Sequence, residues 1–478
     1  MSASRIMARR RPAGARGLAG FLAVLLATSG CSTIGGIGNA LSGGGGPENG
    51  QPGFVGGFLG GVVADEPQAA LVARDVLSAG GTAADAAVAL GFALSVTLPS
   101  RAGLGGGGAC LAFAAGGKGA SKGVPDAVMF VPPAPAHPGA ADRPAAVPML
   151  ARGLFALHAR YGDRRFEALI APAEQMARFG VPASRAFVRD LTVVAGPLAA
   201  DPGARAVFFP TGQPVVEGAQ LLQPGLGGTL GQLRVAGIGD LYQGALAHLL
   251  VEAGRDAGAG LSAEDLRAAL PKLTPPLRLE VGNDVVAFLP PPADGGLAAQ
   301  AAFEALRQDS AAVPAAGERA LAAAARFRQT VGSLPALPAS TTFATLDKNG
   351  NAVVCALTMN NLFGTGRVAT GTGMLLAASP AWHPPALLSA ALVYNANLNA
   401  FRAAIGGSGQ AGAPLATAVA LTQALADTGR TANPMPTPVP EPGRANVIQC
   451  NRYLPSNGST CGWATDPRGA GLALGSNR

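Results

Sequence analysis

The stretch that decides the fold is STTFATLDKNGNAVVCALTMNN, residues 340–361. Two apolar runs rich in β-branched residues, 340–347 and 352–359, flank the short polar segment 348–351. Asn-Gly between two such runs is the strongest short-range hairpin signal, so the stretch predicts two antiparallel strands. With a two-residue loop at Asn349-Gly350, Thr341 would lie opposite Thr358.

Hydroxyl and amide side chains gather at the open end of this predicted hairpin. Ser340 and Thr341 begin the first strand, and the second strand ends at Thr358, just before Asn360 and Asn361. A hydroxyl becomes a useful nucleophile only when a neighbouring group accepts its proton. Taken alone the pattern remains ambiguous, because Thr pairs across strands are ordinarily structural.

The upstream region predicts helices and one tightly packed strand. Residues 66–98 read as two helices joined at 79–82, with Thr82 capping the second. The glycine run 103–108 leads into a strand at 109–114 and is not followed by Lys-Ser/Thr. We therefore expect it to allow close backbone packing and not to cradle a phosphate.

Three separated segments resemble the gamma-glutamyltranspeptidase family. They are residues 66–108 with GGTAADAA at 80–87, residues 340–373 with DKNGNAV at 347–353 and NNLFGTG at 360–366, and Asp-Pro-Arg at 466–468. The resemblance implies an α+β fold, the four-layer αββα sandwich of N-terminal-nucleophile hydrolases. It also implies a precursor that cuts itself into a large-subunit region, 61–339, and a small-subunit region, 340–478, intertwined in one domain.

The family's catalytic group is the terminal residue that the cut exposes. A gap-free match places Ser340 there, where the family has Thr, and Thr341 is the alternative. The freed α-amino group, with a pKa near 8, can take the hydroxyl proton, and attack on an amide then gives an acyl-enzyme. The other matching positions are Thr358, which orients the nucleophile, the substrate contacts Asn360 and Asn361, and the oxyanion donors Ala411 and Gly412.

The match breaks down at the residues that hold a glutamyl group. Residues 129–135 lack the family's Arg for the α-carboxylate, Ala386 and Leu387 replace its paired serines, and residues 377–382 contain no acid for the α-amino group. One hypothesis is a hydrolase or acyltransferase acting on glutathione, other γ-glutamyl compounds or a more apolar amide or peptide. The alternative is an inactive, lipid-anchored binding or structural protein of the envelope.

The N-terminus predicts export. Arginines precede the apolar run 18–27, and small residues end at Cys31. This is typical of a bacterial lipoprotein signal peptide over 1–30, with lipidation at Cys31 and a flexible tether over 31–60. A plain cleaved signal peptide would leave the compartment unchanged. We expect a membrane lipoprotein that faces the periplasm.

The cysteines and histidines indicate which disulfides form and whether the chain binds a metal. Cys450 and Cys461 flank a turn-rich loop, and in an exported protein we expect them to pair. Cys110 and Cys355 lie in apolar runs and are expected to be buried small hydrophobic residues, not metal ligands. The four histidines are scattered, so neither a metal nor a cofactor is expected. The 5% aromatic content and the absence of a basic cluster beyond the signal peptide argue against nucleic-acid binding.

Overall fold

The structure is a computed structural model that describes residues 59–115, 123–139, 141–308, 312–328 and 337–475. The predicted signal peptide, the lipidation site Cys31 and nearly all of the tether lie outside these residues. No helix among the described residues has the length and apolar character needed to cross a membrane.

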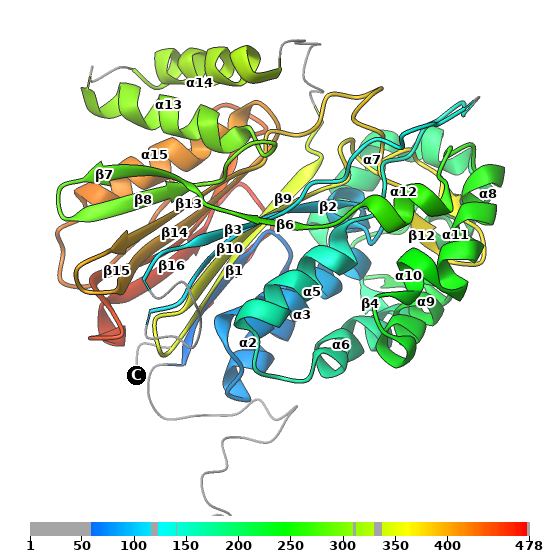
Figure 1. Cartoon of the computed structure of the whole chain (residues 1–478), viewed down its shortest axis with the longest axis horizontal. Helices are drawn as coiled ribbons and strands as arrows, with labels where there is room; N and C mark the ends of the chain where they lie inside the picture. Colours follow the sequence, from blue (N-terminus) through cyan, green and yellow to red (C-terminus); the bar gives the residue numbers. More distant parts are fainter. Residues whose placement is uncertain (1–58, 116–122, 140, 309–311, 329–336, 476–478) are drawn as a thin grey trace, which may run out of the picture. The chain divides into compact units, whose positions relative to one another are not determined.

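The predicted hairpin lies inside a seven-stranded sheet (Figure 1). All its neighbouring strands pair antiparallel. In spatial order the strands are β17 (Leu472–Gly475), β1 (Gly60–Ala64), β9 (Ser340–Asp347), β10 (Ala352–Thr358), β2 (Gly107–Phe113), β3 (Asp126–Phe130) and β6 (Lys272–Thr274).

A six-stranded antiparallel sheet packs against the first. Its order is β16 (Cys461–Thr465), β15 (Arg444–Leu454), β14 (Ala400–Ser408), β13 (Ser389–Asn395), β8 (Asp284–Phe288) and β7 (Leu277–Val281). Strands from both sides of residue 340 therefore contribute to each sheet, so the regions 61–339 and 340–478 are intertwined.

Helices cover the outer face of each sheet (Figure 1). The second sheet is covered by α13 (Gly295–Gln308) and α15 (Gly412–Ala426), and α14 (Val313–Arg328) packs on these two helices. On the side of the first sheet lie α2 (Pro67–Ser78), α3 (Ala83–Thr97), α4 (Pro99–Ala102), α5 (Leu150–Tyr161), α6 (Phe166–Phe179), α7 (Arg185–Ala199), α8 (Pro202–Phe208), α9 (Pro224–Ala236), α10 (Asp240–Gln243), α11 (Ala245–Asp256) and α12 (Ala263–Ala268).

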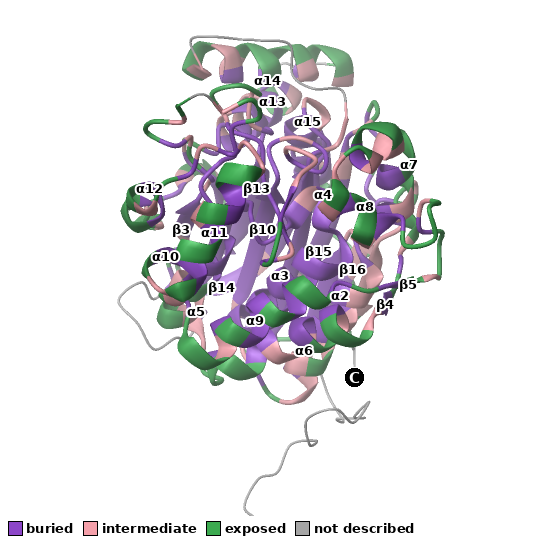
Figure 2. Cartoon of the chain, turned by 90° about the vertical axis from the view of Figure 1, so that its right-hand side faces the viewer, coloured by how far each residue is buried: buried purple, intermediate pink, exposed green. Residues whose placement is uncertain are grey.

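Three apolar cores hold the four layers together. One joins helices to the first sheet, the second lies between the sheets, and the third joins the second sheet to α13 and α15. Figure 2 shows the sheets buried and the outer faces of the helices exposed. Along β9, Phe343 packs in the first core and Ala344 in the second. Because side chains alternate along a strand, Ser340 shares the inter-sheet face with Ala344.

The predicted helix start and glycine packing are confirmed. Thr82 and Asp85 form a reciprocal capping box at α3, whose residues are all buried. A Cβ at Gly106 would lie 2.3 Å from the carbonyl oxygen of Thr358, and one at Gly108 2.3 Å from that of Ala356. Side chains there would push β2 away from β10, so the glycines serve close strand packing.

Two disulfides lie between neighbouring strands. Cys450–Cys461 joins β15 to β16, as predicted. Cys110 and Cys355 are buried, as expected, but they are also bonded to each other, a disulfide that was not predicted from the sequence. They are 245 residues apart in sequence and become direct neighbours only when β2 pairs with β10.

Short two-stranded pairs and one 3₁₀ turn complete the described structure. These elements are β4 (Val181–Pro182) with β5 (Gln220–Leu221), β11 (Val368–Ala369) with β12 (Met374–Leu375), and η1 (Gly458–Thr460). The segment that carries β11 and β12 follows the hairpin and forms one wall of the cavity described below.

Candidate active site

The β9–β10 hairpin pairs one residue out of the predicted register. Thr358 lies opposite Ser340, and Leu357 lies opposite Thr341. The Asp347 carboxylate accepts hydrogen bonds from the N–H groups of Asn349 and Asn351, at 2.9 and 3.1 Å. Gly350 follows with a φ of 83°. The loop therefore has three residues with a left-handed glycine at its end, and the predicted two-residue loop was wrong.

The corrected register brings Ser340 and Thr358 to the same face of the first sheet. Both are buried, at 1% and 0% exposure. The Gly409 N–H points at the Ser340 hydroxyl oxygen from 3.4 Å, a long hydrogen bond that shows how closely the end of β14 approaches. Thr341 is engaged elsewhere, because its hydroxyl donates to Asp65 at 2.9 Å.

The carbonyl group of Ala339, directly before Ser340, is held by two donors. The Thr358 hydroxyl donates to this oxygen at 2.8 Å, and the Met359 N–H donates to it at 3.3 Å. In turn the Thr358 hydroxyl oxygen accepts the N–H of Asn360 at 2.8 Å. Two donors on one carbonyl oxygen would stabilise the negative charge that forms there when a nucleophile attacks its carbon.

Asp65 is a site residue that the sequence reasoning missed. One carboxylate oxygen accepts from the Thr341 hydroxyl, the Thr342 N–H and the Ser408 hydroxyl, at 2.9, 3.1 and 3.2 Å. The other accepts from the Asn446 side chain at 2.8 Å. Asp65 thus ties the start of β9 to β14 and β15 in the facing sheet. The only signal in the sequence for this role is that Asp65 directly follows a strand.

Asn360 and Asn361 lie beside the hairpin's open end. Asn360 has a φ of 61°, and its side-chain N–H group donates to the Ala378 carbonyl at 2.8 Å. Its side-chain oxygen is buried without a hydrogen-bond partner among the described residues. A buried acceptor of this kind costs about 1–3 kcal/mol unless a ligand or water meets it. The Asn361 side chain donates to Gly364 at 3.2 Å and lines a cavity.

The predicted oxyanion pair Ala411-Gly412 stands where the chain enters α15. The Gly412 N–H donates to the Gly409 carbonyl at 2.9 Å and is therefore occupied. In contrast, the N–H groups of Gln410 and Ala411 donate to no described residue. Because Gly409 also contacts the Ser340 hydroxyl, this turn brings two backbone donors without a described partner to the side of the fold that carries Ser340.

At the positions where the family has glutamyl-binding residues, this chain has buried apolar side chains. Met129 lies in β3 at 5% exposure. Ala386 and Leu387 are buried, at 3% and 0%. None of these side chains can hold a carboxylate.

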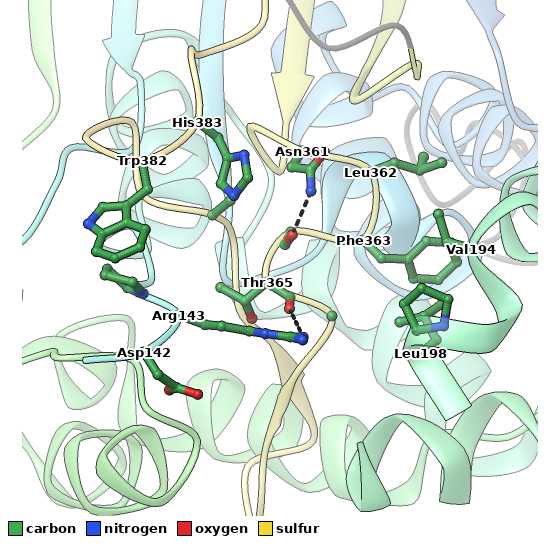
Figure 3. Close-up of a pocket in the computed structure, with 15 residues that line it drawn as sticks. Asp142, Arg143, Val194, Leu198, Asn361, Leu362, Phe363, Thr365, Trp382 and His383 are labelled. Atoms are coloured by element: carbon green, nitrogen blue, oxygen red, sulfur yellow. Dashed lines mark hydrogen bonds between the residues drawn. The ribbon is translucent and has the colours of Figure 1, made fainter. Parts of the chain in front are cut away.

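A cavity of about 300 Å³ opens beside Asn361 (Figure 3). One wall is apolar and comes from α7, through Val194 and Leu198, and from Phe363. The opposite side carries Arg143 and His383, with Trp382 beside them. Among the described residues no group of His, Cys, Asp or Glu is placed to hold a metal ion.

Layers of helix, sheet, sheet and helix, with a hydroxyl residue opening an inner strand, define the class of N-terminal-nucleophile hydrolase folds. The model of the gamma-glutamyltranspeptidase family matches residues 69–316. The chain belongs to this family.

Comparison with known proteins gives distant relatives. The chain is 29% identical over 251 residues to the glutathione hydrolase proenzyme of Bacillus subtilis strain 168, a match covering 49% of this chain and 42% of that protein. It is 27% identical over 383 residues to the corresponding Escherichia coli K12 proenzyme, covering 66% and 65%. The chain thus spans less than two thirds of the length of these curated relatives.

A solved structure extends the likeness over nearly the whole chain. The cephalosporin acylase from Bacillus halodurans superposes with a TM-score of 0.71 and covers 90% of this chain and 98% of its own. Sequence identity to it is 19%, so the likeness establishes the fold alone.

Proposed function

We propose that this chain is a self-processing amide hydrolase or acyltransferase whose nucleophile is Ser340. The observation that carries the proposal is the Ala339 carbonyl, which accepts hydrogen bonds from Thr358 and Met359 immediately before a buried serine. Those two donors would stabilise the oxyanion that forms when the 339–340 bond is cut from within. Family membership supports the same reaction class.

Self-cleavage follows from this geometry in two steps. The Ser340 hydroxyl oxygen attacks the Ala339 carbonyl carbon, and the resulting oxyanion is stabilised by the Thr358 hydroxyl and the Met359 N–H. The C–N bond then breaks, the Ser340 nitrogen takes the proton that its hydroxyl lost, and an ester joins Ala339 to the serine oxygen. Water hydrolyses this ester, which leaves a carboxylate on Ala339 and a free α-amine on Ser340.

The processed enzyme uses the same serine on a substrate amide. The new α-amine accepts the hydroxyl proton as the oxygen attacks, and it returns that proton to the departing amine. The free N–H groups of Gln410 and Ala411 supply the donors for the substrate oxyanion. Water or another amine then takes the acyl group. Because the family's glutamyl clamp is absent, the acyl group differs from a tightly bound γ-glutamyl zwitterion.

Thr341 is the competing nucleophile, since its hydroxyl donates to the Asp65 carboxylate, a potential base. Ser340 is favoured because Thr358 lies opposite it and holds the carbonyl before it. The test compares Ser340→Ala with Thr341→Ala on reducing denaturing gels. We expect Ser340→Ala to remain one chain and Thr341→Ala to yield two fragments. The opposite pattern would transfer the role to Thr341.

An inactive binding protein is the second candidate, and the apolar clamp positions favour it. A wild-type chain that stays uncut and turns over no amide would support that candidate.

We further propose an exported, periplasm-facing lipoprotein anchored at Cys31. The two disulfides support export, because such bonds persist in oxidising compartments. Labelling with a palmitate analogue should mark the wild type and not Cys31→Ser; equal labelling of both would exclude this anchor.

A further inference from the structure

Two backbone segments pack against each other beside Ser340. The first is the donor turn, residues 409–412, which contains the N–H groups proposed to bind the substrate oxyanion. Its Gly409 N–H reaches the Ser340 hydroxyl oxygen at 3.4 Å. The second is the backing segment, residues 439–443, which ends a proline-rich stretch and leads directly into β15.

The two segments touch backbone to backbone. A Cβ on Gly409 would lie 2.1 Å from the Pro442 carbonyl oxygen, and a Cβ on Gly412 would lie 2.7 Å from the Gly443 Cα. Gly409 also has a φ of 99°, in the left-handed region that glycine adopts most readily. Because the contact leaves no free space, a shift of the backing segment displaces the donor turn.

Arg468, from the Asp-Pro-Arg motif, holds the backing segment in place. Its guanidinium donates to the Val439 and Gly443 carbonyl oxygens at 2.7 and 2.8 Å. It also donates to the Glu441 carboxylate at 3.3 Å. Two further hydrogen bonds, of 3.0 and 2.8 Å, go to the two carboxylate oxygens of Asp466, which is buried at 4% exposure. The side chain thus ties the backing segment to a buried carboxylate outside it.

A second arginine supports one end of the backing segment. Arg444 donates to the Gly443 carbonyl at 2.9 Å and pairs with Glu441 at 2.8 Å. Its position directly after the segment means that it acts where the chain is already held by β15. The contact with the Val439 carbonyl, at the opposite end, comes from Arg468.

We propose that Arg468 is a positioning residue for the oxyanion donors. By holding the backing segment against the donor turn, it keeps the Gln410 and Ala411 N–H groups in place to bind a substrate oxyanion. The inference deepens the proposed function and rests on it for the role of those two donors. Because such donors act mainly in the transition state, loss of Arg468 lowers kcat more than it raises KM.

The first experiment observes the donor turn without catalysis. Hydrogen exchange is followed by mass spectrometry at single-amide resolution in full-length chain carrying Ser340→Ala, with and without Arg468→Met. The reporter is the Gly412 N–H, which closes the turn by donating to the Gly409 carbonyl at 2.9 Å. We expect this amide to exchange about tenfold faster when Arg468 is replaced, since local opening governs its exchange. Unchanged exchange would overturn the inference.

The matched control is Arg402→Met in the same background. Arg402 lies on β14, which leads into the donor turn, and it pairs with Asp284 and donates to the Leu425 carbonyl at 3.3 Å. Its side chain is 17% exposed, against 26% for Arg468. We expect Arg402→Met to lower stability and to leave Gly412 exchange unchanged relative to amides in the middle of β14. An equal acceleration in both variants would reject a specific role for Arg468.

Arg468→Lys separates the charge from the contacts with the backing segment. Lysine can pair with Asp466, but its single nitrogen cannot also reach the Val439 and Gly443 carbonyls in the forked geometry of arginine. This variant keeps the buried carboxylate paired and so tests the inference even where Arg468→Met does not fold. We expect its Gly412 exchange to lie within about twofold of that in Arg468→Met. Protection equal to that of the Ser340→Ala parent would overturn the inference.

Turnover by processed chain with an intact Ser340 distinguishes this inference from the proposed function. The probe is p-nitrophenyl butyrate, whose acyl group passes to the serine oxygen as p-nitrophenolate leaves and is then released by water. We expect Arg468→Lys to lower kcat about tenfold and to change KM less than about twofold. If the wild type releases no p-nitrophenolate while Arg468→Lys loosens the turn, the proposed function fails and the positioning role stands. If the wild type turns over and Arg468→Lys changes neither kcat nor Gly412 exchange, the positioning role fails and the proposed function stands.

Discussion

Thr358 does two tasks with one hydroxyl group. It donates to the Ala339 carbonyl and accepts the Asn360 N–H, both at 2.8 Å. It thereby links the proposed cleavage site with Asn360, a residue expected to contact substrate. Its place opposite Ser340 depends on a single-residue shift in hairpin pairing.

Removal of that hydroxyl should slow self-cleavage. For Thr358→Val we expect a rate about 100-fold lower, since loss of one oxyanion donor typically has this effect. The control is Thr345→Val on the paired strand β9, which removes a buried hydroxyl that donates to the Ala83 carbonyl at 2.7 Å. Time courses on reducing gels measure both. Equal slowing in the two variants would show a general folding defect instead.

Asp65 should matter for stability because every partner in its hydrogen bonds is a donor. Asp65→Asn would turn an N–H group toward donors on β9, β14 or β15. We expect the free energy of unfolding to fall by about 3 kcal/mol. Asp75→Asn, at an exposed pair with Arg74, should change it by less than about 0.5 kcal/mol. Denaturant titration measures both, and similar small losses would contradict a central role for Asp65.

At the scale of single elements, α2 begins at a buried carboxyl group. Glu66 caps the helix by accepting the Ala69 N–H at 2.7 Å, and its other oxygen is buried without a partner among the described residues. Burial raises the pKa of Glu66 above its ordinary value of 4.5, although the Ala69 hydrogen bond acts in the opposite direction.

The raised pKa predicts how stability changes with pH. The folded state binds the Glu66 proton more tightly than the unfolded state does, so this stabilisation is complete below pH 4.5. It is lost as pH rises through the folded-state pKa. Glu66→Gln keeps the shape without titrating, so its stability relative to wild type should rise with pH above 4.5 and then level off. Denaturant midpoints across pH 4–8 measure this. If the difference in stability between Glu66→Gln and wild type did not change with pH, the raised pKa of Glu66 would be contradicted.

Local elements could be predicted from the sequence more completely than the contacts between elements that are distant in the sequence. The hairpin's existence and the Thr82 cap follow from nearby residues, and both were confirmed. The register was wrong by one residue because Asp347 fixes the loop with its side chain. Asp65 and the Cys110–Cys355 bond were missed, because their partners come from strands that only the complete fold brings together.

At the scale of the whole molecule, one disulfide spans the proposed cut. Cys110 precedes residue 340 and Cys355 follows it, so scission leaves the two fragments covalently joined. We expect processed wild type to run as one species on a non-reducing denaturing gel and as two on a reducing gel. Cys355→Ala should give two bands under both conditions. Separation of wild-type fragments without reductant would contradict this bond.

The most direct measurement is the mass of the smaller fragment after reduction, taken from protein purified without added protease. Processing by Ser340 predicts a polypeptide that begins at Ser340 and carries an unmodified α-amine. A fragment beginning at Thr341, or a chain that remains whole from the large-subunit region through the hairpin, would contradict it.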